Sequence, residues 1–559
     1  MKDKLKALIA GTIRTFYNVK QAIWLSVAAW RSGVHIHRKS PLRWELSVPH
    51  EGAFDGKEVT ERNINFVIDL LKNAGIDYFV VRGKSRKLSV GVMVEHRQRV
   101  IELISGSEEL KNFYYLIYKE KYNLWIPKLL HGGISGNDTR KALAITLYRN
   151  IGSSGRRIID GSKYGVTVEF WHTEADLSPV MKQRVMAEAG IIDEAALSQS
   201  LIAPIENGVT RVVSGGDKSK QSLDIGGQKH PALRVFTNKL LSDVDFPIDV
   251  VYTWVDDSDP VWLDKYEKAR QKLDSNFKNN SSARYANNDE LRYSLRSIEM
   301  FAPWVRNIYI VTDSQTPTWL DESSSRIKVV DHRDIFSDTS ALPVFNSHAI
   351  ESQLHHIDGL SEHYLYLNDD VFIANPTLPE TFFFASGIAK VQPSSAIIGT
   401  GNPTAYESAP SSAGKNARKI IEDKFGVFIT NKFRHTAIPL IRSASYQVEK
   451  ENRRVVGKTM HSKFRSPEDI PFTTILMQSY LLATGKGVPS TFPAVTIGSL
   501  SEHEAAKQIK VLMQSDRIIT FCLNEVNGEG EDAHKVVERM HDFLKEYYPY
   551  PASWEKYDE

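Results

Sequence analysis

Three strand-like segments in the second half of the chain each run into acidic residues. They cover Ile248–Val255, Asn307–Thr312 and Tyr364–Asn368, and the acids that follow are Asp256–Asp257, Asp313 and Asp369–Asp370. All three segments are rich in β-branched and aromatic residues, which is typical of buried strands. Helical patterns separate them, and this alternation predicts an α/β fold with a mostly parallel, Rossmann-like sheet that is covered on both faces.

The segments between these strands have helical periodicity. Leu291, Leu295 and Ile298 share one face of a predicted helix over Asp289–Phe301, and a second helix is predicted over Ser347–Ile357. In open α/β sheets, ligands bind beyond the carboxyl ends of the parallel strands. We therefore expect the acids at the three strand ends to meet at one edge of the sheet.

Carboxylates at such an edge suit a hard divalent cation. Mg²⁺ and Mn²⁺ prefer oxygen ligands and often share them with substrate phosphates. An acid that follows a strand also forms turns and caps helices, and this alternative stays open for any one of these acids taken alone.

The first half of the chain predicts a separate α/β domain over residues 41–205. A helix is expected at Asn63–Leu71, and strands at Tyr78–Val81, Leu88–Val94 and Val166–Trp171. We find no chemistry-bearing motif there, so a substrate-binding, assembly or purely structural role stays open. Residues 206–247 predict a flexible linker, because paired glycines bracket a polar run of lysines and serines. The domain that contains the acidic strand ends covers residues 248–559.

Residues 1–40 predict a basic amphipathic helix. Apolar residues recur there at helical spacing: Leu5, Leu8, Ile9, Ile13, Phe16 and Tyr17. Asp3 is the single acid among many basic residues: Lys2, Lys4, Lys6, Arg14, Lys20, Arg31, Arg38 and Lys39. The segment also contains Trp24 and Trp30. Such a helix binds at an anionic lipid surface. Packing on the next domain is the alternative. No run reaches the ~18–20 apolar residues of a membrane span, and a cleavable signal is not expected.

The composition excludes several classes of protein. The 559 residues carry a net charge of +2, from 70 basic and 68 acidic residues, which argues against nucleic acid as a partner. Cys522 is the only cysteine, so neither an internal disulfide nor a cysteine-based zinc cluster is expected. One thiol is typical of a protein in a reducing cytosol.

Beyond these patterns, long motifs resemble the four conserved regions of the Stealth family. They include IDVVYTWVDD, ARYANNDELRYSLRSIEMFAPWVRNIYIVT and LPVFNSHAIESQLHHIDGLSEHYLYLNDDVFI. The matching segments are Ile248–Trp262, Ala283–Leu320, Leu342–Pro376, His435–Ser443 with Phe464–Asp469, and Phe521–Trp554. The family contains bacterial capsule and exopolysaccharide sugar-phosphate transferases and the animal N-acetylglucosamine-1-phosphotransferase. The resemblance implies a GT-A-like catalytic domain.

It also implies an enzyme, a phosphotransferase that moves a hexose-1-phosphate or N-acetylhexosamine-1-phosphate from a UDP-sugar to a hydroxyl of a capsular or exopolysaccharide glycan. A phosphodiester forms and UMP leaves. Because the sequence has no lumenal features, we expect a cytoplasmic enzyme with peripheral association at the inner face of the membrane. A metal-dependent glycosyltransferase that releases UDP and a non-catalytic glycan-assembly subunit are the alternatives.

The resemblance assigns Asp370, His435 and Arg465 to catalysis. Asp369, Asp370 and Asp256 match its acidic positions and are expected to hold Mg²⁺ or Mn²⁺, with Asp256 also a contact to the donor. An imidazole such as that of His435 suits a general base, and a guanidinium forks onto phosphate oxygens.

Further donor-binding residues are expected in two places. Arg284, Asp289 and Arg292 lie around a predicted helix N-terminus, a location suited to anions, although Glu290 and Arg292 could equally form a structural charge network. Asn416 and Arg418 follow a stretch rich in glycine, serine and proline, Gly399–Gly414, which is either a mobile lid or an ordinary loop.

Four histidines before the third strand, His348, His355, His356 and His363, raise the question of a zinc site. We do not expect one, because the resemblance places this stretch in a helix and loop and because no thiolate lies nearby in the sequence.

Overall fold

The computed structural model divides the chain into two compact units, Met1–Lys239 and Leu240–Glu559. It describes residues 35–40, 43–48, 50, 52–119, 127–130, 133–134, 136–139, 141–152, 159–272, 285–404, 406–497, 502–523 and 532–556. The predicted amphipathic helix falls almost entirely on residues 1–34, and this prediction lies outside the described residues, as does Arg284.

An eight-stranded mixed sheet forms the centre of the N-terminal unit, in the order β12-β13-β3-β4-β9-β7-β5-β6. Its strands are β12 (Lys220–Ile225), β13 (Gln228–Leu233), β3 (Phe79–Arg82), β4 (Leu88–Met93), β9 (Val166–Trp171), β7 (Ala142–Tyr148), β5 (Tyr114–Lys119) and β6 (Lys128–Leu129). The smaller strands are β1 (His35–Ser40), β2 (Arg43–Val48), β8 (Asn150–Ile151), β10 (Leu201–Ile202) and β11 (Val212–Val213).

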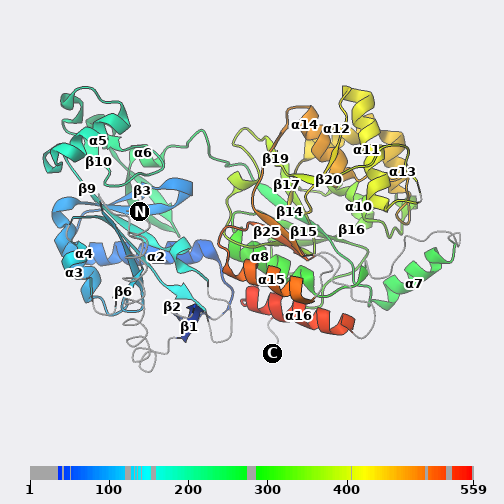
Figure 1. Cartoon of the computed structure of the whole chain (residues 1–559), viewed down its shortest axis with the longest axis horizontal. Helices are drawn as coiled ribbons and strands as arrows, with labels where there is room; N and C mark the ends of the chain where they lie inside the picture. The colour runs from blue at the N-terminus through cyan, green and yellow to red at the C-terminus, as the bar shows by residue number, and fades with distance from the viewer. Residues whose placement is uncertain are drawn as a thin grey trace, which may run out of the picture. The chain divides into compact units, whose positions relative to one another are not determined.

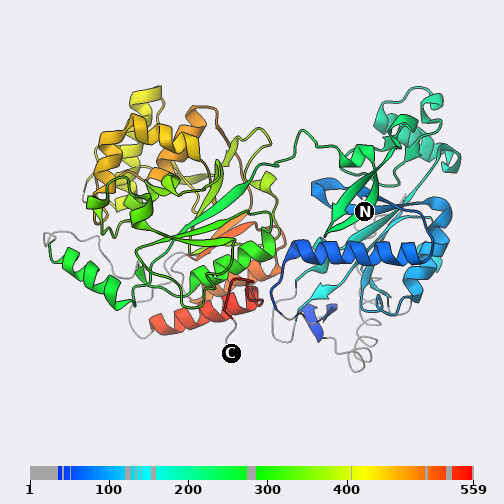
Figure 2. The same ribbon diagram turned by 180° about the vertical axis from the view of Figure 1, so that it is seen from behind.

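The long helix α2 (Gly56–Asn73) runs along one face of this sheet (Figure 2). Asp55 caps its N-terminus by accepting hydrogen bonds from the backbone of Lys57 and Glu58, and Ile64, Val67, Ile68 and Leu71 bury its apolar side in the core. The other helices of the unit are α3 (Arg97–Gly106), α4 (Gly136–Thr139), α5 (Pro179–Ala189) and α6 (Arg234–Thr237).

The prediction of a flexible linker over residues 206–247 is wrong. Strands β12 and β13 pair as an antiparallel hairpin, and Ala232 of β13 pairs in parallel with Val80 of β3. Gly226 and Gly227 form the two-residue turn, where both have positive φ, 59° and 79°. These glycines therefore close a hairpin, as in a type I′ turn, instead of loosening a connection.

The central sheet of the C-terminal unit has the order β16-β15-β14-β17-β22. Its strands are β16 (Ile327–Asp331), β15 (Ile308–Thr312), β14 (Ile248–Thr253), β17 (His363–Asn368) and β22 (Ile438–Ile441). Strands β16, β15, β14 and β17 are parallel, and the edge strand β22 is antiparallel to β17. The predicted α/β class and mostly parallel sheet are confirmed, and β14, β15 and β17 end together at one edge.

Helices cover this sheet; α11–α14 lie together in Figure 1, and α12 contacts the edge strand β22. The helices are α7 (Pro260–Arg270), α8 (Glu290–Phe301), α9 (His332–Ile335), α10 (Ser347–Glu351), α11 (Ala409–Phe425), α12 (Arg442–Glu451), α13 (Arg453–Met460), α14 (Gln478–Ala483), α15 (Glu502–Gln514) and α16 (Asp532–Tyr547). The remaining strands are β18 (Val371–Ile373), β19 (Ala389–Val391), β20 (Pro393–Ile397), β21 (Asn431–Phe433), β23 (Gly487–Pro489), β24 (Ala494–Ile497) and β25 (Thr520–Leu523).

Two predicted segments differ from the structure. The helix expected over Ser347–Ile357 splits into α10 and a short 3₁₀ turn, η10 (Leu354–His356), and between them Gln353 donates its side-chain amide to the carbonyl of Ser352. The stretch Gly399–Gly414, which the sequence left open as a lid or an ordinary loop, becomes helical at Ala409. Within the described part of the chain, no helix has the length and apolar character that a membrane crossing needs.

Candidate active site

Asp370 lies at the turn between β17 and β18 and contacts residues from two other segments. Its Oδ1 atom is 3.6 Å from Nε2 of His435, which precedes β22. Its Oδ2 atom accepts a hydrogen bond from the Cys522 thiol at 3.2 Å, because β25 pairs with β18 and sets Cys522 opposite Val371. The structure therefore brings together a carboxylate, an imidazole and a thiol from distant parts of the sequence.

Three carboxylates, from Glu290, Asp369 and Asp370, gather at this strand end. Burial, together with the negative charges of Glu290 and Asp370, raises the pKa of Asp369 well above its ordinary value. Burial and the charge of Asp370 likewise raise the pKa of Glu290. Oδ1 of Asp370 is buried and accepts no hydrogen bond from the described residues. Neighbouring carboxylates that repel one another are suited to a cation.

A cavity of about 150 Å³ opens beside this cluster. Asp369 and Arg465 contribute charged groups to its lining, and Asn368 and Ser347 contribute polar ones. Trp262, Tyr285 and Phe345 form an aromatic wall, in which the rings of Trp262 and Tyr285 are 5.3 Å apart. Asp370 and His435 are adjacent to this cavity through Asp369 but are not among its lining residues. The cavity thus joins charged groups to an aromatic wall.

Arg465 is held in position by a network of buried polar groups. Its Nη2 atom donates to the hydroxyl of Ser347 at 2.9 Å. The loop that carries Arg465 is fixed by Asp469, a fully buried residue, which accepts hydrogen bonds from the side chain of Asn346 and the backbone of Ser466 at 2.9 and 2.8 Å. Asn416 donates to the carbonyls of Pro467 and Asp469. Asn416 therefore supports the Arg465 loop and does not line the cavity.

Asp256 is not brought into the carboxylate cluster. Its carboxylate accepts hydrogen bonds from the backbone and hydroxyl of Ser258 at 3.0 and 2.7 Å, and so caps the turn that follows β14. The expectation that Asp256 holds a metal with Asp369 and Asp370 stays a prediction, and the acid whose charge acts on Asp369 in the structure is Glu290.

Arg292 and Arg418 have partners that a phosphate would have to displace, and Asp289 lies beside Arg292. Arg292 donates to the buried Glu555 at 2.6 Å and lies 3.9 Å from Asp289, so it belongs to a structural charge network, although with these partners and not with Glu290 as expected. The buried guanidinium of Arg418 donates to the carbonyls of Ile398, Gly399 and Ile429. These contacts favour structural roles for Asp289, Arg292 and Arg418 over the predicted contact with the donor.

Sequence reasoning missed two features of the site. It assigned no role to Cys522, because a thiol opposite Asp370 follows from the pairing of β18 with β25 and leaves no local pattern. It also did not foresee the aromatic wall, although Trp262 follows Asp256–Asp257 and Tyr285 precedes Asp289 within the segments that resemble the family. Glu290 could have been predicted as a third carboxylate of the site, since it follows Asp289 in the acidic run NNDE.

Family models match three stretches of the chain. Residues 246–274, 284–391 and 512–559 match the Stealth protein conserved regions 1, 2 and 4. Two exopolysaccharide phosphotransferases of Streptomyces coelicolor are each 35% identical to the chain. The match to one covers 89% of this chain and 82% of the relative. The match to the other covers 90% of this chain and 51% of the relative. The chain thus spans about half the length of the latter. The exopolysaccharide phosphotransferase CpsY of Mycobacterium tuberculosis is 32% identical over 90% of each chain.

These matches show that the chain belongs to the Stealth family, a family of transferases. Among solved structures, the galactosyltransferase LgtC aligns with 53% of this chain and 95% of its own, at 12% identity and a TM-score of 0.26. Mouse xyloside xylosyltransferase 1 aligns with 50% of this chain and 97% of its own, at 8% identity and a TM-score of 0.26.

Proposed function

We propose that this chain transfers a sugar-1-phosphate from a UDP-sugar to a hydroxyl of a capsular or exopolysaccharide glycan, and that UMP leaves. The observation that carries the proposal is the convergence at one strand end of Asp369, Asp370 and His435 beside a cavity that Arg465 also lines. Exopolysaccharide phosphotransferase is the name that the relatives carry, and it agrees with this chemistry. The donated group is a hexose-1-phosphate or an N-acetylhexosamine-1-phosphate.

The reaction needs an activated hydroxyl and a stabilised phosphate. The acceptor oxygen attacks the phosphorus that bears the sugar, a new P–O bond forms, the bond to the bridging oxygen of the diphosphate breaks, and UMP departs with that oxygen. His435 takes the proton of the acceptor hydroxyl, and the carboxylate of Asp370 beside it stabilises the imidazolium that results. Arg465 faces the charge that develops on the phosphate oxygens.

The carboxylates of Glu290, Asp369 and Asp370 repel one another, and one oxygen of Asp370 is buried without a hydrogen-bond donor, which supports a cation beside them. We propose that these residues hold Mg²⁺ or Mn²⁺, which would neutralise negative charge on the diphosphate. Removal of divalent cations with EDTA should then stop turnover, and added Mg²⁺ or Mn²⁺ should restore it. Full activity in the chelated enzyme would contradict the metal proposal.

The aromatic wall supports a nucleotide as the donor. Tyr285 donates its hydroxyl to the carbonyl of Phe345 at 2.7 Å, which fixes its ring, and the ring of Trp262 lies against it. Flat, rigid rings of this kind stack on a base. We therefore place the uracil of the donor at the aromatic side of the cavity and the diphosphate at the side of Asp369 and Arg465.

A donor screen tests the proposal. The full chain is incubated with single UDP-sugars and an oligosaccharide acceptor, and the masses of the products are measured by mass spectrometry. A product heavier than the acceptor by a sugar phosphate is expected. A product heavier by the sugar alone would favour a glycosyltransferase, and bound donor without any product would favour a non-catalytic assembly subunit.

We also propose that the enzyme works at the cytoplasmic face of the membrane. The basic, amphipathic sequence of residues 1–39 supports peripheral association there. Removal of residues 1–39 should move the protein from the membrane fraction to the soluble fraction. Unchanged partitioning would instead favour a helix that packs on the protein.

A further inference from the structure

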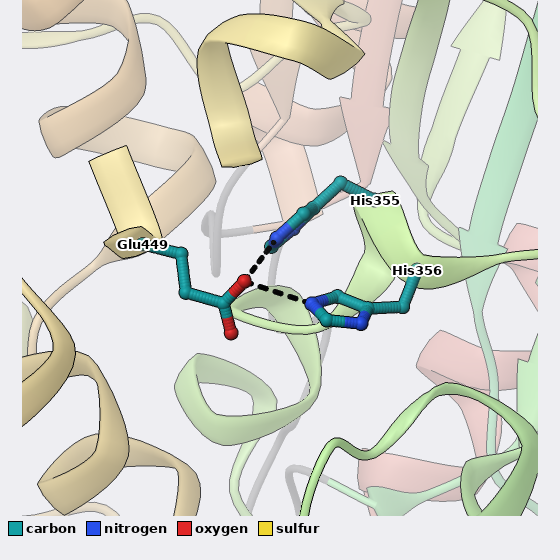
Figure 3. Close-up of side chains that lie close together, drawn as sticks. All are labelled: His355, His356 and Glu449. Carbon is teal, nitrogen blue, oxygen red and sulfur yellow. Dashed lines mark hydrogen bonds and ion pairs between the residues drawn. The ribbon is translucent and has the colours of Figure 1, made fainter. Parts of the chain in front are cut away.

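Three side chains outside the proposed active site converge on one point. His355 and His356 of η10 both direct Nε2 at the same oxygen of Glu449 on α12, at 2.9 and 2.8 Å (Figure 3). These ligand atoms all lie within 4.8 Å of one another. The other two histidines of the sequence cluster lie elsewhere: His348 is 3.5 Å from Asp469, and His363 contacts the carbonyl of Gly387.

We propose that His355, His356 and Glu449 form a zinc site. Two imidazoles and one carboxylate match the ligand set of zinc centres that have three protein ligands and one open position. Nitrogen ligands favour Zn²⁺ over Mg²⁺, which distinguishes this site chemically from the carboxylate cluster at the end of β17. The absence of a nearby thiolate does not exclude it, because the carboxylate comes from a helix far along the chain.

The backbone around this site is fixed independently of the ligands. Arg442, at the start of α12, donates to the carbonyls of His355, Ile357 and Leu360 at 2.8–2.9 Å. Glu449 lies two turns further along the same helix and on the same side as Arg442. These bonds hold η10 against α12, so the three ligand side chains need little rearrangement to bind an ion.

The site is buried on one side and open on the other. The side chain of His355 is fully buried, whereas those of His356 and Glu449 are 23% and 19% exposed. An ion can therefore enter from solvent past His356 and Glu449, and water can occupy the fourth position.

Bound zinc would tie together the two strands that carry the proposed catalytic pair. The turn η10 leads into β17, which ends before Asp370, and α12 follows directly on β22, which His435 precedes. Strands β17 and β22 are neighbours, with His363 opposite Ile441. A clamp between η10 and α12 would thus fix the register of β17 and β22 from the end opposite to Asp370 and His435. This consequence, unlike zinc binding itself, rests on the proposed function.

Zinc titration of the metal-free full chain tests the proposal, with calorimetry for binding and thermal denaturation for stability. In the wild type, zinc at about 100 times Kd should raise Tm by roughly 5 °C. Both the binding and the Tm shift should be lost in Glu449→Gln and in His356→Ala. The matched control is Cys522→Ser, which alters a second group of side chains that could hold a metal, Asp370, His435 and Cys522, and should keep both.

Two results would overturn the zinc site. One is the lack of zinc binding by the wild type, and the other is zinc binding that Cys522→Ser abolishes while Glu449→Gln and His356→Ala leave it intact. The clamp has its own readout: amide hydrogen exchange in β17 and β22 should slow when zinc is added to the wild type but not to Glu449→Gln. Unchanged exchange with zinc bound would overturn the clamp, whatever the enzyme's activity.

Discussion

His435 and Asp370 lie 3.6 Å apart, between Nε2 and Oδ1, because the strands that bear them run in opposite directions. Tyr366 of β17 pairs with Ile438 of β22, so the end of β17 lies beside the start of β22. The single antiparallel strand of an otherwise parallel sheet is therefore what brings the imidazole to the carboxylate.

Asp370→Asn should lower turnover at least about 100-fold. Asparagine keeps the shape of the side chain but removes the charge that faces His435, and because it also relieves repulsion from Glu290 and Asp369, Tm should stay the same or rise. Product formation by mass spectrometry and thermal denaturation measure the two effects. Asp423→Asn, in an exposed ion pair with Lys419 on α11, is the control and should retain wild-type turnover. Wild-type turnover in Asp370→Asn would refute the assignment.

His435→Gly should lose turnover about 100-fold or more, and added imidazole should restore part of it, since the missing group is a base and not a packing element. The side chain is 37% exposed, which leaves room for the small molecule to enter. Rates with and without imidazole, compared with those of His461→Ala, measure the effect, because His461 also pairs with an aspartate, Asp338, but on the surface. Full activity of His435→Gly without imidazole would exclude His435 as the base.

Arg465→Lys should lower kcat/KM by about 10- to 100-fold, although the charge is kept, because an ammonium cannot donate two parallel hydrogen bonds to a phosphate. Arg465→Ala should lower it further. Steady-state kinetics at varied donor concentration measure both. Arg453→Lys, on the exposed side of α13, provides the control. Equal rates for the wild type and Arg465→Lys would show that the fork of the guanidinium is not used.

Glu169, in the N-terminal unit, should make local stability depend on pH. Burial raises the pKa of Glu169 to about 7, although hydrogen bonds from Ser89 and Trp171 act to lower that pKa. A carboxyl whose pKa is higher in the folded state stabilises the fold fully below its unfolded pKa, 4.5, and this contribution is lost as the pH rises through about 7. The loss is on the order of 3 kcal/mol.

Amide hydrogen exchange of β9 in the full chain measures this effect. Exchange in the wild type should become faster between pH 5 and about pH 8, after correction for the intrinsic rate, whereas Glu169→Gln should remove most of that change. Glu102→Gln, at an exposed carboxylate on α3 that accepts a hydrogen bond from Gln98, should behave as the wild type does. Identical pH profiles for Glu169→Gln and the wild type would contradict the shift.

The sequence predicted β14, β15 and β17 of the five-stranded central sheet but not β16 or β22, because those three strands are rich in β-branched and aromatic residues and run into acids. In β14, Ile248 and Val250–Tyr252 are buried, and β15 is buried throughout, as expected for parallel strands covered on both faces. Asp370, His435 and Arg465 came from family resemblance; His435 lies 3.6 Å from Asp370, whereas Arg465 lines a cavity that Asp369 also lines. No local sequence pattern could show which polar side chains already have hydrogen-bond or ion-pair partners in the fold.

Asp256 and Arg418 illustrate this limit. Each matches a functional expectation by residue type and position, yet Asp256 caps a turn through Ser258, and Arg418 is buried on backbone carbonyls. The same reason explains the missed hairpin at Gly226–Gly227, since paired glycines loosen a linker and close a tight turn with equal ease. Partners that lie far along the chain decide between such alternatives.

The nucleotide released from the donor tests the central claim most directly. The wild type is incubated with a UDP-sugar that it accepts and with a glycan acceptor, and the nucleotide is identified by chromatography. We predict UMP, in an amount equal to the phosphodiester formed, with little UMP from Asp370→Asn. Release of UDP alone would show that the bond broken is the one between the sugar and its phosphate, and would contradict the account.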